Sequence, residues 1–283
     1  MSSPSNFLMV GLKGSGKTTY LAALWHYLES AEVGDRLMIP QLQPDRDYLN
    51  AIRNSWLALR PLERTSMRTK ATASLRLHDT KLDADIVMTV PDLSGESFRL
   101  QWFTRKAPAS YVEFAKKCTG VFLFIHPADF RRTHAIKAKS LNEESTDSVD
   151  AEVAIPVSEN WTPEQSSTQV QLVDIMQLLL GLRDEAGIMR LAVIISAWDL
   201  IKAPLSPENW LESRLPLLSQ FLRANSDWLP SDVFGVSSQG GDLEVDREKL
   251  LNKATASARC MAIRGDSLES VSITAPLQFL LNI

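Results

Sequence analysis

The sequence predicts an α/β protein in which helices cover both faces of a mostly parallel β-sheet. Four short apolar runs, at residues 6–12, 120–126, 191–196 and 232–238, have the length and composition of buried parallel strands. Stretches with helical periodicity separate these runs, which is typical of a parallel sheet. A hairpin predicted at residues 71–90 supplies two more strands, so we expect six strands in total.

The first strand and the first helix flank a glycine-rich turn. The run NFLMVGL is closed by glycine, and KTTYLAALWHYLES, which begins at Lys17, carries apolar residues at helical spacing until about Gly34. A second helical stretch covers residues 45–59, with its large apolar residues on one face. We expect it to form a helical elaboration of the domain at about residues 40–65.

The central part of the chain reads as a hairpin. ATASLRL at residues 71–77 alternates small or apolar side chains with polar ones, residues 79–83 form a turn, and DIVMTV returns as an apolar strand. APLQFLL closes the chain. Further helices are predicted at residues 97–117, 166–184 and 207–225.

A polar segment at residues 131–165 interrupts the alternation of strands and helices. It mixes both signs of charge and lacks apolar periodicity, so we expect a flexible insertion that the sheet does not need. The chain, residues 1–283, is otherwise expected to form a single domain.

Composition excludes several classes of protein. The 283 residues carry a formal net charge of -4, whereas general nucleic-acid binding needs a basic surface. Cys118 and Cys260 are far apart without CxxC spacing, which favours free thiols in a reducing compartment, and the histidines show no zinc-binding pattern. The first apolar run is too short for a signal peptide or a membrane span. We therefore expect a cytoplasmic protein with no membrane segment.

The turn after the first strand fits the pattern GxxxxGK[ST] at every fixed position. GLKGSGKT at residues 11–18 lies between a predicted strand and a predicted helix, which is the context that a phosphate-binding loop requires. The loop N–H groups would wrap a phosphate, Lys17 would reach the β- and γ-phosphate oxygens, and Thr18 would offer a hydroxyl to Mg²⁺. The predicted phosphate-binding residues are Gly11, Lys13, Gly14, Ser15, Gly16, Lys17, Thr18 and Thr19.

The segment Asp92-Leu93-Ser94-Gly95 follows a predicted buried strand. A lone DxxG is also compatible with a simple turn at the end of a strand. However, the carboxyl ends of parallel strands form the rim where α/β sheets bind ligands. There Asp92 could hold Mg²⁺ through water, and the Gly95 N–H could contact a γ-phosphate.

Two further segments complete a series of four. IISAWD places Asp199 just past a predicted strand, and GVSSQGG at residues 235–241 ends another strand in small polar residues. In this order the four segments resemble the signature of the Ras-like, TRAFAC-class P-loop GTPases. The resemblance implies GTP or GDP with Mg²⁺ as ligands and a six-stranded sheet with one antiparallel edge strand. By the family pattern Asp199 accepts hydrogen bonds from guanine, and the last segment contributes Ser237, Ser238 and Gln239.

The sequence departs from this family pattern at two positions. Ala197 stands where the family carries a lysine that covers one face of the base, and Trp198 could provide that cover or could belong to the core. Glu96 stands where many members carry a glutamine that positions water. Because its negative charge would lie beside the γ-phosphate, we expect slow intrinsic hydrolysis.

PLERTSMRT, which precedes the hairpin, offers the threonine that completes the shell of Mg²⁺ and γ-phosphate in the family. We favour Thr65 over Thr69 because Arg64 precedes it and could lie over the phosphates as an arginine finger. An ordinary solvated loop is the alternative for both residues. The expected catalytic residues are Lys17, Arg64, Thr65 and Glu96, and the expected metal ligands are Thr18, Asp92 and Thr65.

A narrower resemblance rests on Trp56, the ERT segment, SAWD and the closing ITAPLQFLL. These segments look like the small bacterial double-GTPase group, which is associated with multi-component conflict (antiviral) systems. The resemblance implies a GTP-dependent switch with effector or regulator proteins, or a second copy of the chain, as partners. A P-loop ATPase or small-molecule kinase, and a nucleotide-binding scaffold without turnover, are the alternatives.

Overall fold

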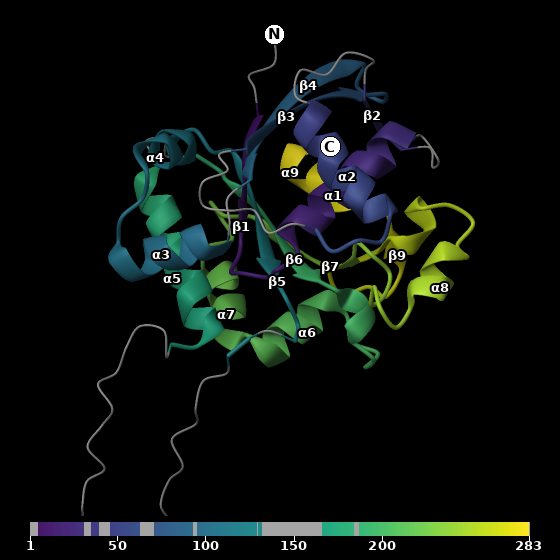
Figure 1. Ribbon diagram of the computed structural model, residues 1–283. Coiled ribbons are helices and arrows are strands. Elements are labelled where there is room, and N and C mark those ends of the chain that lie inside the picture. Colours follow the sequence, from purple (N-terminus) through teal and green to yellow (C-terminus); the bar gives the residue numbers. More distant parts are fainter. Residues whose placement is uncertain are drawn as a thin grey trace, which may run out of the picture.

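In the computed structural model the chain forms one mixed β-sheet with helices packed on both of its faces (Figure 1). The structure describes residues 5–30, 35–39, 46–62, 71–92, 95–128, 130–131, 166–183 and 187–282. Most of the predicted insertion, residues 132–165, lies outside these ranges, as do residues 63–70.

The sheet has nine strands within the described ranges, in the order β2-β3-β4-β1-β5-β6-β7-β8-β9. Its five central strands, from β4 to β7, run parallel to one another, whereas the two outer pairs on each side are antiparallel. The strands are β1 (Ser5–Val10), β2 (Leu37–Met38), β3 (Ala71–Asp79), β4 (Ala84–Asp92), β5 (Gly120–Ile125), β6 (Arg190–Ser196), β7 (Ser231–Ser237), β8 (Met261–Arg264) and β9 (Ser270–Val271).

Two helical layers enclose the sheet (Figure 1). One apolar core forms beneath α1, α2 and α9, and a second forms beneath α3, α4, α5, α6 and α7. The helices are α1 (Lys17–Ser30), α2 (Arg46–Leu57), α3 (Gly95–Thr104), α4 (Ala109–Lys116), α5 (Thr168–Leu182), α6 (Pro207–Arg214), α7 (Pro216–Ala224), α8 (Arg247–Leu251) and α9 (Ala275–Leu281). Because both faces are covered, β5 is apolar and buried along its whole length, and β6 is buried after its first residue.

The predicted α/β class and the predicted hairpin are confirmed, but the expected number of strands is too low. The expectation of a single antiparallel edge strand is also wrong, because β2 pairs outside β3 and antiparallel pairs border the sheet on both sides. All six expected strands are present, and β3 pairs antiparallel with β4 over nine residues. The three missed strands, β2, β8 and β9, have two, four and two residues. Strands this short carry too little alternation to be recognised, and their place in the sheet depends on longer neighbours.

Two predicted helices are each divided in the structure. The stretch at 207–225 breaks at Leu215, because Pro216 has no N–H to continue the hydrogen bonds of α6 and instead begins α7. The stretch at 97–117 breaks at Arg105, whose φ of 57° is left-handed, and α4 begins after Pro108. Each break turns the chain so that both halves can cover the sheet.

Neither Cys118 nor Cys260 forms a disulfide. Burial raises the pKa of the Cys118 thiol to about 11, so this side chain stays protonated near neutral pH. Across the described ranges, we find no helix with both the length and the apolar character needed to cross a bilayer.

The hairpin that carries Asp92 is closed by a buried ion pair. Asp79, at the end of β3, accepts a hydrogen bond from Arg36 Nε at 2.8 Å and others from the N–H groups of Lys81 and Leu82 in the turn. The Arg36 guanidinium, together with these N–H groups, holds the pKa of Asp79 below its ordinary value of 3.8. Asp79 therefore stabilises the turn in its ionised form.

We predict that Asp79→Asn lowers the melting temperature at pH 7 by about 5 °C, because it removes the charge that Arg36 and the turn amides bind. Since the folded-state pKa is depressed, the stabilisation is present above about pH 3.8 and is lost as the pH falls through the folded-state value. The melting temperature of Asp79→Asn should therefore fall less than that of the wild type as the pH is lowered through this range. Asp83→Asn, in the same turn, is the control in thermal unfolding from pH 2 to 7. Its side chain is 97% exposed and its pair with His78 Nε2 at 3.5 Å is screened by solvent, so it should stay within about 1 °C of the wild type.

Candidate functional site

The phosphate-binding loop predicted from the sequence connects β1 to α1. Its lysine is buried, and Lys17 Nζ donates hydrogen bonds to the carbonyl oxygens of Gly11 at 2.8 Å and Leu12 at 3.1 Å. The same ammonium lies 3.2 Å from Ser15 Oγ. Lys17 therefore lies at the centre of the loop, where it could transfer its donors to the oxygens of a bound phosphate.

Gly16 allows the loop to lie close to the end of β6. Its φ of 88° is left-handed, and a Cβ at this position would lie 2.9 Å from Cβ of Ser196. Both the backbone conformation and the lack of space therefore require glycine here. This contact brings the loop directly over the segment that contains Asp199.

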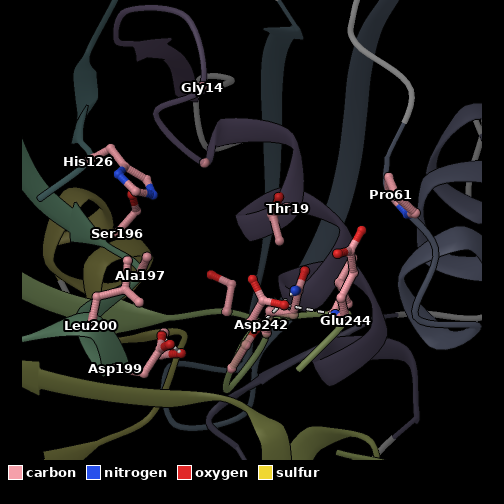
Figure 2. A pocket seen from close by; sticks show the side chains of 16 residues that line it. Gly14, Thr19, Pro61, His126, Ser196, Ala197, Asp199, Leu200, Asp242 and Glu244 are labelled. Carbon is pink, nitrogen blue, oxygen red and sulfur yellow. Dashed lines mark hydrogen bonds between the residues drawn. The ribbon is translucent and has the colours of Figure 1, made fainter. Parts of the chain in front are cut away.

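A cavity of about 410 Å³ opens between the phosphate-binding loop and the carboxyl ends of the parallel strands. In Figure 2, His126 and Ser196 lie below Gly14 on one side, with Ala197 and Asp199 beneath them, and Asp242 and Glu244 lie across from them. The described residues around it are Gly14, Gly16, Thr19, Pro61, His126, Ser196, Ala197, Asp199, Leu200, Ser237, Ser238, Gln239, Gly241, Asp242, Leu243 and Glu244.

Several residues singled out in the sequence meet at this cavity. Gly14, Gly16 and Thr19 come from the first motif, Asp199 from the third and Ser237 to Gln239 from the fourth. Parallel pairing explains this convergence, because β1, β5, β6 and β7 all end at the same edge of the sheet. Motifs separated by more than 180 positions therefore surround one space.

Asp199 is held in place by the end of the neighbouring strand. Ser237 Oγ donates a short hydrogen bond to Asp199 Oδ1, and the same hydroxyl oxygen accepts a hydrogen bond from the Gly240 N–H at 3.0 Å. One serine thus joins the aspartate of the third motif to the loop of the fourth. The carboxylate is half-buried and faces the cavity, where it could accept hydrogen bonds from a ligand.

Trp198 belongs to the core rather than to the cavity, so the suggestion that its indole covers a bound base is wrong for this structure. Its exposed fraction is 5%, and its ring packs on the backbone of β7, where a Cβ on Gly235 would lie 2.3 Å from it. Ala197, just before it, has φ and ψ of 45°, a left-handed conformation that redirects the chain. As a result Trp198 points inward and Asp199 faces the cavity.

Lys13 does not belong to the wall of the main cavity. Its side chain is exposed and borders a separate hollow of about 260 Å³ on the α3 and α5 side of the loop. The other described residues around this hollow are Leu12, Arg99, Trp102, Phe103, Arg131, Thr168 and Gln171. The loop therefore separates the main cavity from a second, cationic one.

The remaining predicted residues are placed only in part. Arg64 and Thr65 fall within residues 63–70, outside the described residues. Asp92 ends β4 and Gly95 and Glu96 begin α3, so their backbone is described and their side chains are not. Asn6 of β1 pairs with Thr89 of the parallel strand β4, so Asp92 leaves the sheet at the same edge as the phosphate-binding loop.

The structure adds residues that the sequence analysis missed. His126 follows β5 directly, so it obeys the same rule that identified Asp199, a polar residue just past a buried strand. Pro61, Asp242 and Glu244 belong to loops that no fixed spacing marks. Hydrogen bonds from the N–H groups of Val245 and Glu244 hold the pKa of Asp242 below its usual value, so this exposed carboxylate is ionised at neutral pH.

Comparison with known proteins assigns the chain to a described family. A family model described as Double-GTPase 1 matches residues 8–280. None of the curated proteins matches the chain. Among solved structures, the chain is similar to the signal recognition particle receptor SRb-GTP/SRX complex from Chaetomium thermophilum, with 13% identity and a TM-score of 0.42 over 88% of this chain and 96% of that one.

We predict that Gly235→Ala lowers the free energy of unfolding by about 2 kcal/mol, because the new methyl group must displace the buried indole of Trp198. Urea unfolding followed by circular dichroism measures this difference. Gly181→Ala is the matched control, since nothing lies within 4 Å of a Cβ at that helical position. It should be neutral or stabilising by up to about 1 kcal/mol, and equal effects of the two substitutions would contradict the tight packing described here.

Proposed function

Because the chain belongs to the Double-GTPase 1 family, we propose that it is a GTP-binding switch that hydrolyses GTP slowly with Mg²⁺. Family membership confirms the narrower resemblance, to the double-GTPase group. The single observation that carries the proposal is the fixed carboxylate of Asp199 in the cavity that the phosphate-binding loop borders.

The arrangement of charge along the cavity supports guanine as the base. Lys17 and the loop N–H groups provide cations and donors at one end, suited to phosphates, while the half-buried Asp199 provides an acceptor further along. Guanine offers two adjacent donors, N1–H and the 2-amino group, to a carboxylate. Adenine has an acceptor at N1 and no 2-amino group, so it would meet Asp199 with lone pairs opposed. We therefore propose that Asp199 selects guanine and that the backbone at Ser238 and Gln239 borders the base.

The residues near the phosphate-binding loop fit a bound magnesium ion. Thr18 lies in the first turn of α1, and Asp92 leaves the sheet at the same edge. Hydroxyl and carboxylate oxygens are the donors that Mg²⁺ prefers. We propose Thr18, Asp92 and Thr65 as the residues that hold it, directly or through water. When bound, Mg²⁺ would offset the charge of the phosphates.

Hydrolysis would depend on groups that orient water and neutralise charge at the γ-phosphate. We propose that Lys17 and Arg64 supply positive charge and that Glu96, at the start of α3, accepts a hydrogen bond from the attacking water. A carboxylate there adds negative charge beside the phosphate, which supports slow turnover. The Gly95 N–H is proposed to contact the γ-phosphate, so that α3 responds to whether GTP or GDP is bound.

A switch of this kind acts by changing its affinity for a partner. We propose that effector or regulator proteins, or a second copy of the chain, recognise the GTP-bound state. The proposal that this state regulates a multi-component antiviral system rests on the family resemblance alone.

We predict that the wild type binds GDP far more tightly than ADP. Asp199→Asn should bind GDP about 100-fold more weakly than the wild type and so lose the preference for GDP over ADP. The amide of asparagine should in turn favour xanthosine diphosphate, whose 2-oxo group accepts a hydrogen bond. Titration with fluorescent GDP, ADP and XDP in Mg²⁺ measures the three affinities. Asp227→Asn, at an exposed aspartate in the turn after α7 that does not line the cavity, is the control.

Two outcomes would redirect the assignment. Equal binding of GDP and ADP by the wild type would favour an ATPase or a small-molecule kinase. Selective GDP binding without release of phosphate from GTP over hours would favour a scaffold without turnover.

We predict that Glu96→Gln increases the single-turnover rate of GTP hydrolysis about tenfold, because glutamine orients water without adding negative charge. Phosphate release from pre-bound GTP measures this rate. Glu113→Gln in α4, whose exposed side chain pairs with Lys116 at 3.2 Å, is the control and should leave the rate unchanged. A slower Glu96→Gln variant would mean that the carboxylate itself takes part in the reaction.

A further inference from the structure

The helix α2 packs against the cavity from outside without belonging to its wall. Leu49, Ile52 and Trp56 form its buried face, with the three- and four-residue spacing of an amphipathic helix. Trp25 of α1 ties the middle of α2 in place, since its Nε1 donates to Asn50 Oδ1 at 3.1 Å. The carboxyl end of α2 meets the loop that follows β7 independently of this bond, through Trp56.

Trp56, near that end, contacts the loop through a buried hydrogen bond. Its Nε1 donates to the carbonyl oxygen of Ser238 at 2.9 Å, and its exposed fraction is 2%. The guanidinium of Arg259 lies 5.2 Å from the centre of the indole ring and donates to the Trp56 carbonyl at 3.4 Å. Trp56 is therefore held on both sides, and it holds the backbone of Ser238 in turn.

A second contact ties the same two segments together further along the chain. Arg247, which begins α8, donates from Nη1 to the carbonyl oxygen of Leu59 at 2.8 Å and from Nη2 to that of Ala58 at 3.3 Å. The loop of residues 238–246 is thus attached to the end of α2 at both of its ends. Pro61, two residues past Leu59, lines the cavity on the other side.

We propose that α2 positions the loop of residues 238–246 for guanine binding. Trp56 is the positioning residue, although its side chain does not line the cavity. This inference rests on the proposed function, since it concerns how the cavity holds guanine. The backbone at Ser238 is fixed by two sets of contacts. The preceding residue, Ser237, is bonded to Asp199 and to the Gly240 N–H, and Trp56 donates a hydrogen bond to the Ser238 carbonyl.

The physical consequence is a lower cost of ordering the loop when a nucleotide binds. A loop held in its binding conformation loses less conformational entropy on binding than a loop that must first be ordered. Without the indole N–H, the Ser238 carbonyl loses its stronger donor and keeps only the weak thiol donor of Cys260 at 3.6 Å. The loop would then be favoured to turn this oxygen toward water. Loss of the hydrogen bond should therefore increase nucleotide dissociation and weaken the discrimination between bases.

The test compares Trp56→Phe with Trp25→Phe. Each substitution removes one indole N–H from the α1–α2 pair, but only the first touches the loop after β7. We expect Trp56→Phe to accelerate dissociation of fluorescent GDP about tenfold, equivalent to about 1.4 kcal/mol, and to lower the preference for GDP over ADP by a similar factor. Trp25→Phe should lower the melting temperature while leaving both quantities within about twofold of the wild type.

Hydrogen exchange in nucleotide-free protein separates this inference from the proposed function. Trp56→Phe should increase amide exchange at residues 238–242 about tenfold, and Trp25→Phe should not. If the wild type shows no preference for GDP, the proposed function fails. If it shows the preference and Trp56→Phe changes neither dissociation nor exchange, or if both variants change them equally, the positioning role is overturned.

A second variant keeps the test valid if Trp56→Phe does not fold. Arg247→Gln shortens an exposed side chain and removes both donors to the end of α2. It should accelerate GDP dissociation about threefold and increase exchange over the same residues. A dissociation rate and an exchange pattern equal to those of the wild type would overturn the proposal.

Discussion

The parallel pairing of the five central strands determines which edge of the sheet carries the segments that follow them. Because β4, β1, β5, β6 and β7 run in one direction, each ends at the same edge of the sheet. The residues that follow three of these strands, among them His126, Asp199 and Ser238, are thereby brought to one cavity. The antiparallel strands on each side extend the sheet without adding to that edge.

The sequence was sufficient for the elements whose pattern is long or whose spacing is fixed. The phosphate-binding loop, the hairpin of β3 and β4, and Asp199 could each be found from local residues. The two-residue strands could not, since their pairing depends on β3 and β8. The inward direction of Trp198 depends on the left-handed Ala197 and on the space above Gly235, which belongs to a different strand. Local periodicity carries no information on packing between strands, so neither the short strands nor the orientation of Trp198 could be predicted from the sequence.

Asp199 and Ser238 are each held in place by a residue distant in sequence. Asp199 depends on Ser237, and the next residue, Ser238, depends on Trp56. Both bonds are made at the end of β7. The end of the cavity around Asp199 is therefore shaped by the strand and the helix that fix these residues, as well as by the residues themselves.

The two outermost strands, β2 and β9, contain only Leu37–Met38 and Ser270–Val271. A strand at the border of a sheet exposes unpaired backbone donors and acceptors that can recruit another chain, and two residues present very few of them. A sheet of nine strands would otherwise be prone to polymerise edge to edge. At the β2 border the cover is partial, because within the described ranges β2 pairs with only two of the nine residues of β3. A continuous intermolecular β-sheet is accordingly disfavoured at the β9 border.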